Sequence, residues 1–318
     1  MKEINNNFHL EPLPPNPLIS IVVPSYNQGA FIRQTLQACL DQDYRPIEIV
    51  VMDGASTDHT VEVLKSFGNL PELRWVSEPD KGVVDAVNKG LRAARGDIAC
   101  IQSSDDFHRP GCFSTVTAAF RDNPEAGLVF GDVERVDPDN RVVYSPRQAR
   151  FSLARLLARQ LYIYQPTAFF RRDLALELGG WNPDIPYVPD IDLWIRLAFH
   201  APVVQCDAVL AAYRTHPGQR DQHRDRIYRD YRRMLELSKE LPAASRRLRR
   251  AAQAGAELMK FRYGGPWTNA QLTRAAWKAL WLRPSLLFSP KLPFYRLIPG
   301  YFTLTGWRRQ WLGPKKGA

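Results

Sequence analysis

Acidic side chains follow two apolar segments of the chain, at the point where each segment ends. Residues 97–102 form a short apolar run that leads through two serines to Asp105 and Asp106, and the buried-strand pattern of residues 47–52 stops at Asp53. Parallel strands of an open α/β sheet bring their ligands to a crevice at the carboxyl ends of the strands, so we expect these acids to converge. Carboxylates there suit a hard divalent cation that bridges a diphosphate. The pattern therefore predicts group transfer from a nucleotide-activated donor.

The elements that must position these acids alternate along the first third of the chain. We expect strands at residues 19–23, 47–52, 73–76 and 97–102, and helices at 29–40, 60–65 and 82–95, the last closed by Gly96 as its C-cap. This βαβαβαβ order is typical of the nucleotide-binding half of a doubly wound fold. The chain has no G-x-G-x-x-G and no G-x-x-x-x-G-K-[ST], which argues against dinucleotide-binding and P-loop folds.

The pattern changes after residue 106. We expect helices at 113–121, 152–160 and 173–178, antiparallel strands at 127–133 and 141–144, a helix that opens at Asp190, one or two closing strands in 203–214, and a charged helix at 222–240. An α/β protein with a mixed central sheet is the predicted fold class.

Composition limits the kind of protein. The chain has 318 residues, of which 45% are hydrophobic and 24% charged, as in an ordinary globular protein with a sizeable core. The four cysteines are scattered, without a C-x-x-C pair, which fits a reducing compartment and argues against a disulfide framework or a zinc site. Residues 1–17 are polar and lack the apolar core of a signal peptide, so we expect a flexible arm and no secretion. No uncharged apolar stretch reaches 18 residues, so no transmembrane helix is expected.

The positive charge is concentrated at one end of the chain. Residues 241–318 hold fifteen Lys and Arg and one acid, Glu257, so their net charge is +14. The net charge of the whole chain is +10, so the first 240 residues carry a net charge of −4. Five of the eight tryptophans lie in the same stretch. Its basic and aromatic residues are Arg246, Arg247, Arg249, Arg250, Trp267, Trp277, Trp281, Trp307, Arg308, Arg309, Trp311, Lys315 and Lys316. Trp mixed with Lys and Arg is typical of a helical element on anionic lipid, so we expect residues 236–318 to be a membrane-associating extension. Nucleic-acid binding, for which no RNA-binding motif is present, and a solvated helical appendage are the alternatives.

Taken in order, the polar segments resemble the motifs of family 2 glycosyltransferases. The motifs are Pro24-Ser25-Tyr26-Asn27, Asp53-Gly54-Ala55-Ser56-Thr57-Asp58, Glu78-Pro79-Asp80-Lys81-Gly82, Asn88-Lys89-Gly90, Ser103-Ser104-Asp105-Asp106, Gly179-Gly180-Trp181, Asp190-Ile191-Asp192-Leu193-Trp194 and Tyr213-Arg214-Thr215-His216-Pro217-Gly218. Each is weak alone, but their shared order over roughly residues 18–235 is specific. The resemblance implies a GT-A fold with a Rossmann-like nucleotide-binding half, an inverting reaction and a metal-assisted nucleotide-sugar donor, most simply a UDP-sugar.

The resemblance also implies where the donor binds. Tyr26 would stack on the base and Asp53 would accept a base N–H, with a core tyrosine and a turn aspartate as the alternatives. Asp80 would reach the base or ribose, unless it only forms a Pro-Asp-x-Gly turn. Asp85 and Asn88 share a helical face and either contact the donor sugar or are merely solvated. The other donor-side residues in this hypothesis are Pro24, Asn27, Ser56, Lys81, Ser104, Asp105 and Arg214, with Arg214 at the diphosphate.

The metal site follows from the same resemblance. The family's D-x-D motif has Ser103 at its first position here, and one of Asp105 and Asp106 would ligate Mn²⁺ or Mg²⁺ while the other touches ribose, unless both are helix caps. His216 would complete the metal shell or contact the diphosphate, unless it is structural. The metal would neutralise charge on the leaving diphosphate.

Catalysis by inversion needs one base near the acceptor hydroxyl, and Asp190 matches the family's acidic position. Asp192 is expected to cap its helix through Arg196 and to lie on the acceptor side with Gln165 and Trp181. Helix capping by both acids, and simple packing of Trp181, are the alternatives. The acceptor would be a glycan or lipid-linked glycan of the cell surface, used at the cytoplasmic face of the plasma membrane.

Two other hypotheses are a nucleotidyltransferase, which would need a basic Gly-rich loop near the first strand, and a degenerate GT-A binding module, which the Ser103 position alone supports.

Overall fold

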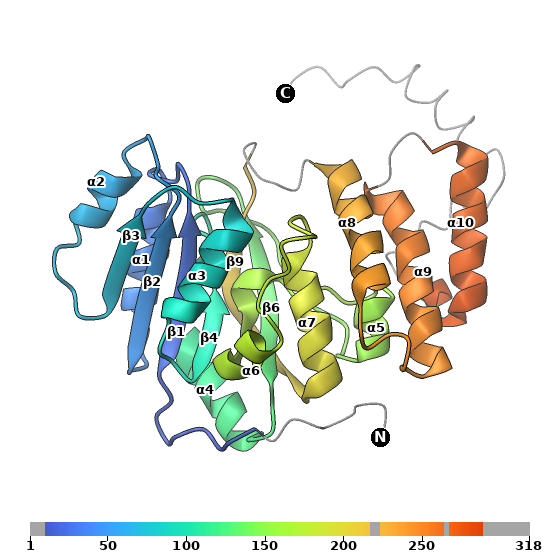
Figure 1. The fold of residues 1–318 in the computed structure, drawn as a ribbon, viewed down its shortest axis with the longest axis horizontal. Coiled ribbons are helices and arrows are strands. Elements are labelled where there is room, and N and C mark those ends of the chain that lie inside the picture. Colours follow the sequence, from blue (N-terminus) through green and yellow to red (C-terminus); the bar gives the residue numbers. More distant parts are fainter. Residues whose placement is uncertain (1–9, 217–222, 264–266, 289–318) are drawn as a thin grey trace. The chain divides into compact units, whose positions relative to one another are not determined.

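The structure is a computed structural model that describes residues 10–216, 223–263 and 267–288 (Figure 1). These residues form two compact units, each described by itself below. The first comprises the chain to residue 153 and from 161 to 220, and the second comprises residues 154–160 and the chain from 221 onward.

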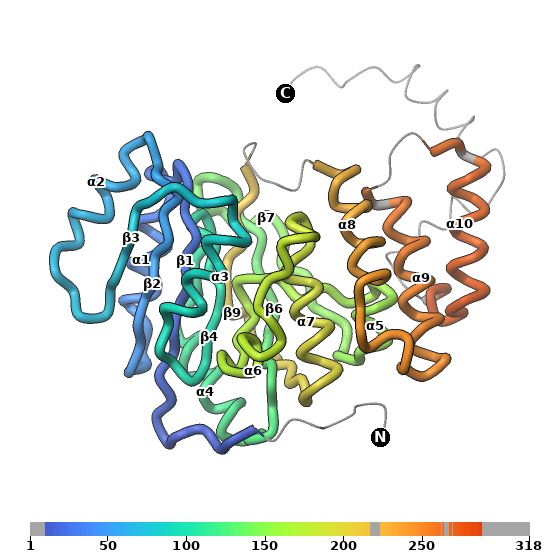
Figure 2. Tube along the Cα trace, in the orientation of Figure 1, coloured from blue at the N-terminus to red at the C-terminus, as the bar shows by residue number. Residues whose placement is uncertain are grey.

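In its described part, the first unit is built on one nine-stranded sheet, in the order β3-β2-β1-β4-β8-β6-β9-β5, with β7 paired to β6. The strands are β1 Ile19–Ser25, β2 Ile47–Asp53, β3 Leu73–Ser77, β4 Ile98–Ile101, β5 Phe107–His108, β6 Leu128–Val136, β7 Val142–Tyr144, β8 Ala168–Arg171 and β9 Val203–Arg214. The helices of this unit are α1 Ile32–Leu40, α2 Thr60–Lys65, α3 Val83–Ala93, α4 Cys112–Asp122, α6 Arg172–Glu177 and α7 Pro189–His200, with a 3₁₀ turn at Gln165–Thr167, while α5 Leu153–Leu157 belongs to the second unit except for its first residue. Figure 2 follows the same path as a Cα trace.

The strands β3, β2, β1 and β4 run parallel and form the nucleotide-binding half that the sequence predicts. Their register pairs Ser25 with Asp53 and Asp53 with Ser77, so β1, β2 and β3 end level with one another. The loops that follow these strands therefore lie along one edge of the sheet, which is where open α/β sheets bind ligands.

The remaining strands make the sheet mixed, as predicted. Strand β8 is antiparallel to β4 and to β6, β9 is parallel to β6, and β5 is antiparallel to β9. One predicted cap differs: α3 ends at Ala93 with Ala94 as its C-cap, and Gly96 instead lies so close to Ser20 of β1 that a Cβ at Gly96 would clash with it. The glycine is needed for close packing and not for a helix cap.

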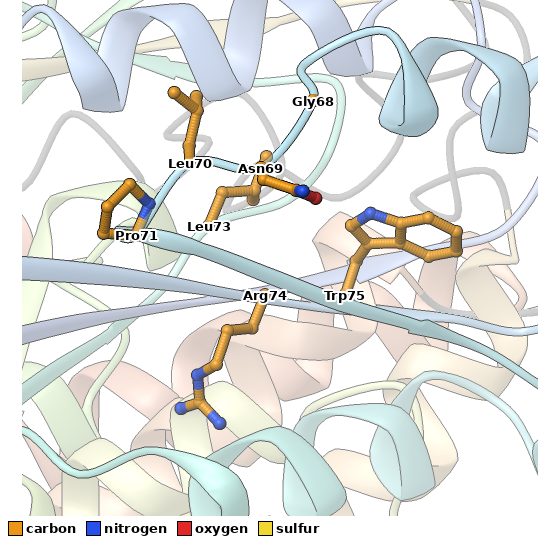
Figure 3. Close-up of a pocket in the computed structure, with 7 residues that line it drawn as sticks. All are labelled: Gly68, Asn69, Leu70, Pro71, Leu73, Arg74 and Trp75. Atoms are coloured by element: carbon orange, nitrogen blue, oxygen red, sulfur yellow. The ribbon is translucent and has the colours of Figure 1, made fainter.

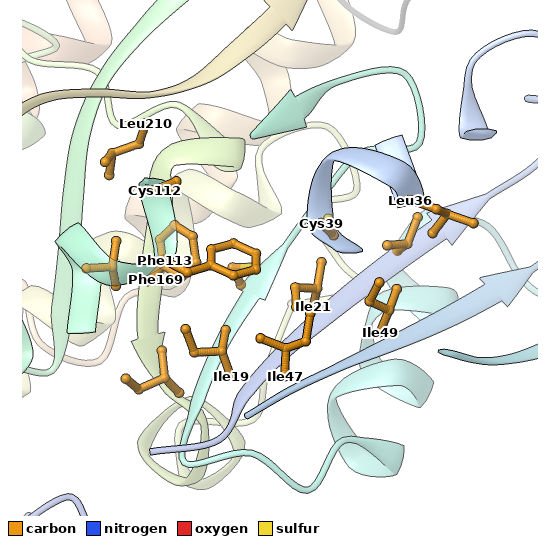
Figure 4. Close-up of a cluster of buried hydrophobic side chains, with 14 of the residues drawn as sticks. Ile19, Ile21, Leu36, Cys39, Ile47, Ile49, Cys112, Phe113, Phe169 and Leu210 are labelled. Atoms are coloured by element: carbon orange, nitrogen blue, oxygen red, sulfur yellow. The ribbon is translucent and has the colours of Figure 1, made fainter. Parts of the chain in front are cut away.

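The core explains why the first strands are continuously apolar. Ile19 and Ile21 of β1 belong to a buried cluster with Cys39 of α1 and Phe113 of α4 (Figure 4). On the other face, Val22 packs so closely against Gly90 of α3 that a Cβ at Gly90 would clash with it. A strand covered on both faces has no polar side. Burial of each large aliphatic side chain contributes about 1.5–3 kcal/mol to the stability of the fold. The strands are therefore held firmly in the core, and the polar loops at their ends start from fixed positions.

The second unit contains α8 Arg224–Leu237, α9 Arg246–Tyr263, α10 Asn269–Leu282 and a 3₁₀ turn at Pro284–Phe288. A capping box between Thr268 and Gln271 starts α10. Tyr231 of α8 donates its hydroxyl to the carbonyl of Leu157 at 2.9 Å. The structure thus groups α8 with the later helices, whereas the sequence hypothesis ends the catalytic domain at residue 235. Every helix in the described ranges is too short or too polar to span a bilayer.

The predicted flexible arm at the start of the chain and the predicted extension at its end are each only partly within the described residues. Residues 1–9 of the predicted flexible arm lie outside the described residues, but residues 10–17 are fixed, because Arg171 donates to the carbonyl of Glu11 at 2.8 Å and Tyr44 to that of Pro17 at 2.8 Å. Of the basic and aromatic residues of the extension, Trp307, Arg308, Arg309, Trp311, Lys315 and Lys316 lie outside the described residues.

Candidate functional site

The carboxylate of Asp53 joins the ends of β2 and β3. Asp53 is 2% exposed, and its Oδ2 accepts hydrogen bonds from the backbone N–H of Ser56 at 2.9 Å and from the Ser77 hydroxyl at 2.6 Å, while Oδ1 accepts from the Ser56 hydroxyl. A carboxylate has about four acceptor positions. Three are used here, so one remains for a donor such as a nucleobase N–H.

The loop after β1 is fixed by Asn27 and leaves Tyr26 exposed. Asn27 has φ of 53°, its side-chain oxygen accepts from the backbone N–H of Thr57 at 2.8 Å, and its own N–H donates to the Ser56 hydroxyl at 2.8 Å. Tyr26 is 60% exposed, which excludes the core-tyrosine alternative. Asn27 therefore braces the loop, and Tyr26 is exposed directly after Ser25, which pairs with Asp53 across the sheet. Pro24 is buried within β1 and holds the strand end.

Asp80 lies beside Asp53 at the same edge. Its Oδ1 accepts from the backbone N–H of Gly82 at 2.7 Å, as an ordinary turn aspartate does. Its Oδ2 would lie 2.7 Å from a Cβ at Gly54, so the carboxylate packs directly on the backbone that follows Asp53. Two acids and an exposed tyrosine thus converge where three parallel strands end.

Asp85 and Asn88 have different roles on α3. Asp85 accepts from the backbone N–H of Lys81 at 3.2 Å and pairs with Lys89 at 3.3 Å; the Lys81 hydrogen bond, together with Lys89, lowers the pKa of Asp85 below its ordinary value. Asn88 instead donates to the Trp181 carbonyl at 2.8 Å and accepts from the Trp181 N–H at 2.8 Å. The Asn88 amide anchors this loop, so Asn88 is not merely solvated, and its contact with the donor sugar stays a prediction.

Trp181 also differs from expectation. Its ring is completely buried, so it packs in the core in place of lining an acceptor pocket. The preceding Gly180 has φ of 65°, and a Cβ there would lie 2.5 Å from the Asn88 side-chain oxygen. The Gly-Gly-Trp motif is therefore a tight turn held against α3.

Arg214 is a structural centre and not a diphosphate ligand. It is 2% exposed and lies between the rings of Phe31, at 5.0 Å, and Phe107, at 5.5 Å. Its guanidinium donates to the carbonyls of Asp105 at 2.8 Å and Pro138 at 3.0 Å and to side-chain oxygens of Asn140 and Gln34, both at 2.7 Å. Burial lowers the pKa of Arg214, although nearby carboxylates oppose that shift. These bonds direct the guanidinium into the protein and away from any diphosphate.

The two acids of the Ser103–Asp106 motif, Asp105 and Asp106, differ in how deeply they are buried. Asp106 is 1% exposed, and its Oδ1 accepts from the backbone N–H of Arg214 at 2.8 Å, so it fixes the end of β9. Ser104 is 5% exposed, and its carbonyl accepts from the Thr35 hydroxyl at 2.9 Å. Metal or ribose contact by Asp106 is thereby replaced by a buried structural role, whereas donor contact by Ser104 stays a prediction.

Asp105 lies next to His216. The Nε2 atom of His216 is 3.0 Å from Oδ2 of Asp105, and the two side chains are 12% and 18% exposed. The imidazole also packs on the Phe31 ring, with centroids 5.0 Å apart. Ligands at adjacent corners of an octahedron with bonds of about 2.1 Å are about 3.0 Å apart, so the pair fits two positions of a Mg²⁺ or Mn²⁺ shell.

No cluster of three or more His, Cys, Asp or Glu suited to a metal occurs within the described residues. Asp105 and His216 would therefore supply only part of the shell. Mg²⁺ is commonly held by one or two protein ligands together with substrate phosphates and water, so the donor set fits a cation that arrives with a diphosphate.

The acids of α7 lie in its first turn. Asp192 accepts from Nε of Arg196 at 2.8 Å, which confirms the predicted contact, and Arg196 also donates to the carbonyls of Leu178 and Gly180, both at 2.6 Å. Because Asn88 of α3 holds the same loop, the start of α7 is tied to α3, whose own start follows the carboxyl end of β3. Asp190 is 7% exposed in this turn.

Gln165 reaches the acidic motif from the 3₁₀ turn before β8. Its amide donates to the Ser103 hydroxyl at 3.1 Å and to the Ile101 carbonyl at 3.3 Å. Sequence reasoning missed the partners that α1 supplies from the other side, namely Phe31, Gln34 and Thr35. Their only sequence signal is helical spacing on one face.

A surface hollow of about 440 Å³ lies elsewhere in this unit (Figure 3). It is lined by Gly68, Asn69, Leu70, Pro71, Leu73, Arg74 and Trp75. These residues lie at the amino end of β3, the edge opposite to Asp53 and Asp80. Its one charged residue, Arg74, already pairs with Glu48 at 2.6 Å. The hollow therefore has no place in the site.

Comparison with known proteins agrees with this geometry. Residues 20–179 match the family model described as Glycosyl transferase family 2. An uncharacterized protein of Mycobacterium tuberculosis (strain CDC 1551 / Oshkosh) is 33% identical over 208 residues, which cover 60% of this chain and 65% of that protein.

Two solved structures share the fold. The crystal structure of S. aureus TarS residues 1–349 in complex with UDP-GlcNAc superposes with a TM-score of 0.65 at 17% identity, covering 84% of this chain and 82% of that one. The mannosyltransferase PcManGT from Pyrobaculum calidifontis, in complex with GDP-Man and Mn²⁺, gives 0.62 at 20% identity, covering 95% and 87%.

The mixed sheet, with its polar loops at one edge, is thus the GT-A fold that these two solved structures share. The chain belongs to glycosyl transferase family 2 and is a glycosyltransferase. The nucleotidyltransferase hypothesis is set aside.

Proposed function

We propose that this glycosyltransferase moves a sugar, with inversion, from a nucleotide-sugar to a glycan or lipid-linked acceptor of a cell-surface polysaccharide, with Mn²⁺ or Mg²⁺ as cofactor. The observation that carries the proposal is the 3.0 Å pair of Asp105 and His216. A buried structural pair would be closed to solvent, whereas both of these side chains are partly exposed.

The donor would bind along the strand ends. Tyr26 stacks on the base, the remaining acceptor position of Asp53 takes a base N–H, and Asp80 lies at the base or ribose. Ser56 and Lys81 border this site, and Asp85 lies at its outer end. A UDP-sugar is our first choice, supported by the UDP-GlcNAc complex of TarS, with a GDP-sugar as the alternative suggested by PcManGT.

The transfer would use Asp190 as the base. Asp190 takes the proton of the acceptor hydroxyl while the oxygen bonds to the anomeric carbon, on the face opposite to the breaking bond to the nucleoside diphosphate. When bound, the divalent cation neutralises charge on that leaving group. Asp105 and His216 hold the cation, while Gln165 and Asp192 lie on the acceptor side.

The location follows from the second unit. Residues 223–288 carry fifteen Lys and Arg against five Asp and Glu. On α10, Trp277 and Trp281 are 56% and 72% exposed, and the Arg250 guanidinium lies 5.2 Å from the Trp281 ring. Exposed tryptophans among cations suit an anionic lipid surface. We place the protein in the cytoplasm, bound peripherally to the inner face of the plasma membrane; nucleic acid is not its partner.

The experiment that tests this function is incubation with UDP-, GDP- and dTDP-sugars in MnCl₂ or in EDTA, while release of nucleoside diphosphate is followed with and without cell-envelope glycolipid. Metal-dependent release, accelerated by the glycolipid, is expected from wild type and not from an Asp190→Asn variant. A degenerate binding module, which the Ser103 position would favour, would bind nucleotide but release nothing, and that result would reject the proposal.

A further inference from the structure

Three tyrosines and one arginine form a continuous aromatic group beside the acidic motif. The ring centroids of Tyr162 and Tyr164 are 4.7 Å apart and those of Tyr164 and Tyr213 are 5.8 Å apart, both edge to face. The guanidinium of Arg135 lies 5.9 Å from the Tyr213 ring. All four residues are partly exposed. We call this group the tyrosine cluster.

The tyrosine cluster adjoins the reaction site through its chain neighbours. Tyr164 precedes Gln165, whose amide donates to Ser103 at 3.1 Å. Tyr213 precedes Arg214, whose guanidinium donates to the carbonyl of Asp105 at 2.8 Å. Two members of the cluster are therefore each one residue from a direct contact with the acidic motif.

The cluster lies on the face of the sheet that carries α7. Successive strand residues point to opposite faces. Arg214 packs on Phe31 beside α1, so Tyr213 points to the other face. Phe170 also points away from the α1 side and meets Trp194 of α7, with ring centroids 5.5 Å apart. Tyr213 and the helix that carries Asp190 therefore share a face.

The chemistry of the cluster fits a sugar ring. A pyranose has one face of C–H groups and a rim of hydroxyls, and tyrosine offers both an apolar ring and a polar tip. Arg135 adds donors: it donates to the Thr215 hydroxyl at 3.1 Å, and its Nε is buried without a partner among the described residues. Aromatic walls with a few placed polar groups are the usual lining of a small-ligand site.

The nucleobase is not the occupant that this arrangement favours. Tyr26, Asp53 and Asp80 lie after β1, β2 and β3, in the parallel half of the sheet, whereas Tyr213 lies on β9 in the mixed half. The geometry points to the tyrosine cluster as the subsite for the terminal pyranose of the acceptor, with Tyr164 and Tyr213 as stacking surfaces and Arg135 as a hydroxyl ligand. The acceptor is then saccharide-ended and not a bare lipid or a peptide. This inference rests on the proposed glycosyl transfer and specifies its second substrate.

Saturation-transfer NMR on the full-length protein tests it, with methyl pyranosides of mannose, galactose, rhamnose and N-acetylglucosamine as probes, each with UDP or GDP and Mn²⁺ present. At least one probe should receive saturation at its ring C–H protons. That signal should fall at least fivefold in Tyr164→Ala and in Arg135→Gln, and it should persist in Tyr213→Phe, which keeps the ring. Trp75→Leu is the control, because Trp75 is a partly exposed aromatic residue of β3, at the opposite end of the strand order from β9, and its signal should not change.

Two results would overturn the inference: no probe binds wild type, or the signal is unchanged in both Tyr164→Ala and Arg135→Gln. Calorimetric binding of UDP or GDP to the same samples separates this test from that of the proposed function. Nucleotide binding without a cluster-dependent sugar signal rejects the subsite alone. A cluster-dependent sugar signal without nucleotide binding supports the subsite and rejects the proposed donor chemistry.

Discussion

Oδ2 of Asp105 and Nε2 of His216 lie 3.0 Å apart although the residues are 111 positions apart in the chain. Arg214 accounts for this contact, because its guanidinium holds the carbonyl of Asp105 while its N–H is held by the carboxylate of Asp106. The acidic loop and the end of β9 are thereby fixed to each other. His216, two residues further on, is carried to Asp105 by that connection.

Replacing Asp190 by Asn should abolish transfer and spare donor binding. Loss of a general base lowers the rate by about 10²–10⁴-fold. The proposed contacts to the nucleobase and the ribose of the donor do not involve Asp190, so nucleotide affinity should be kept. The measurements are product formation and calorimetric affinity for the nucleoside diphosphate. Asp192→Asn is the control, since its carboxylate is already bound to Arg196, and it should lower stability more than rate. Lost nucleotide affinity in Asp190→Asn would contradict the assignment.

Replacing Arg214 by Gln should destabilise the first unit. The change removes the donor of four part-buried hydrogen bonds and the packing of the buried guanidinium on Phe31 and Phe107, which together cost about 3 kcal/mol or more. For a unit of this size that corresponds to a fall in melting temperature of about 6–12 °C. The exposed Lys81→Gln should leave the melting temperature unchanged. If Arg214→Gln melts like wild type but binds diphosphate more weakly, the guanidinium is a ligand after all.

Stability should fall on mild acidification because of His108. Burial lowers the pKa of His108 from 6.5 to about 3. The folded protein keeps this imidazole neutral, whereas the unfolded chain takes up a proton below pH 6.5, so stability is present above that pH and is lost as pH falls toward 3. Between pH 7 and pH 5 the loss amounts to about 2 kcal/mol.

Urea unfolding at both pH values measures this loss. A His108→Leu variant should lose that part of the pH dependence, whatever its absolute stability, while a variant of the exposed His59, His59→Gln, should retain it. An identical pH dependence in His108→Leu and wild type would show that the buried imidazole is not the cause.

Membrane binding should depend on the exposed tryptophans of α10. Burying about 60 Å² of each ring at about 25 cal/mol per Å² is worth about 1.5 kcal/mol, or roughly tenfold in partitioning. We expect Trp277→Ser and Trp281→Ser to reduce sedimentation with phosphatidylglycerol vesicles by that factor each. Val143→Ser, an exposed apolar change on β7, should have no effect. Equal binding of wild type to neutral vesicles would contradict an anionic surface as the partner.

Sequence reasoning recovered most of the fold, because its signals are local. The apolar runs of β1 and β2 and the helical spacing in α1 and α3 indicated element type and order, and the resemblance supplied the sheet class. The Asp192–Arg196 pair was also accessible, because its spacing of four residues places both on one helical face.

The roles of Asp106, Arg214, Asn88 and Trp181 were not accessible in this way. An aspartate after a strand and an arginine before a histidine have the same sequence signal whether they bind a ligand or a buried backbone group. Only the register of β5 with β9 and the closeness of α3 to the Gly180 turn decide which groups meet. The tyrosine cluster was missed for the same reason, since Tyr164 and Tyr213 are neighbours only in the folded sheet.

Calorimetric titration of UDP and GDP, with and without Mn²⁺, tests the central assignment most directly. We predict that Mn²⁺ strengthens binding to wild type by about tenfold or more, and by less than about twofold in Asp105→Asn and His216→Ala, because each variant removes one of two protein ligands. Asp139→Asn, an acid that is 70% exposed in the loop before β7, should behave like wild type. Full Mn²⁺ enhancement in Asp105→Asn and His216→Ala would show that the cation and its diphosphate bind elsewhere.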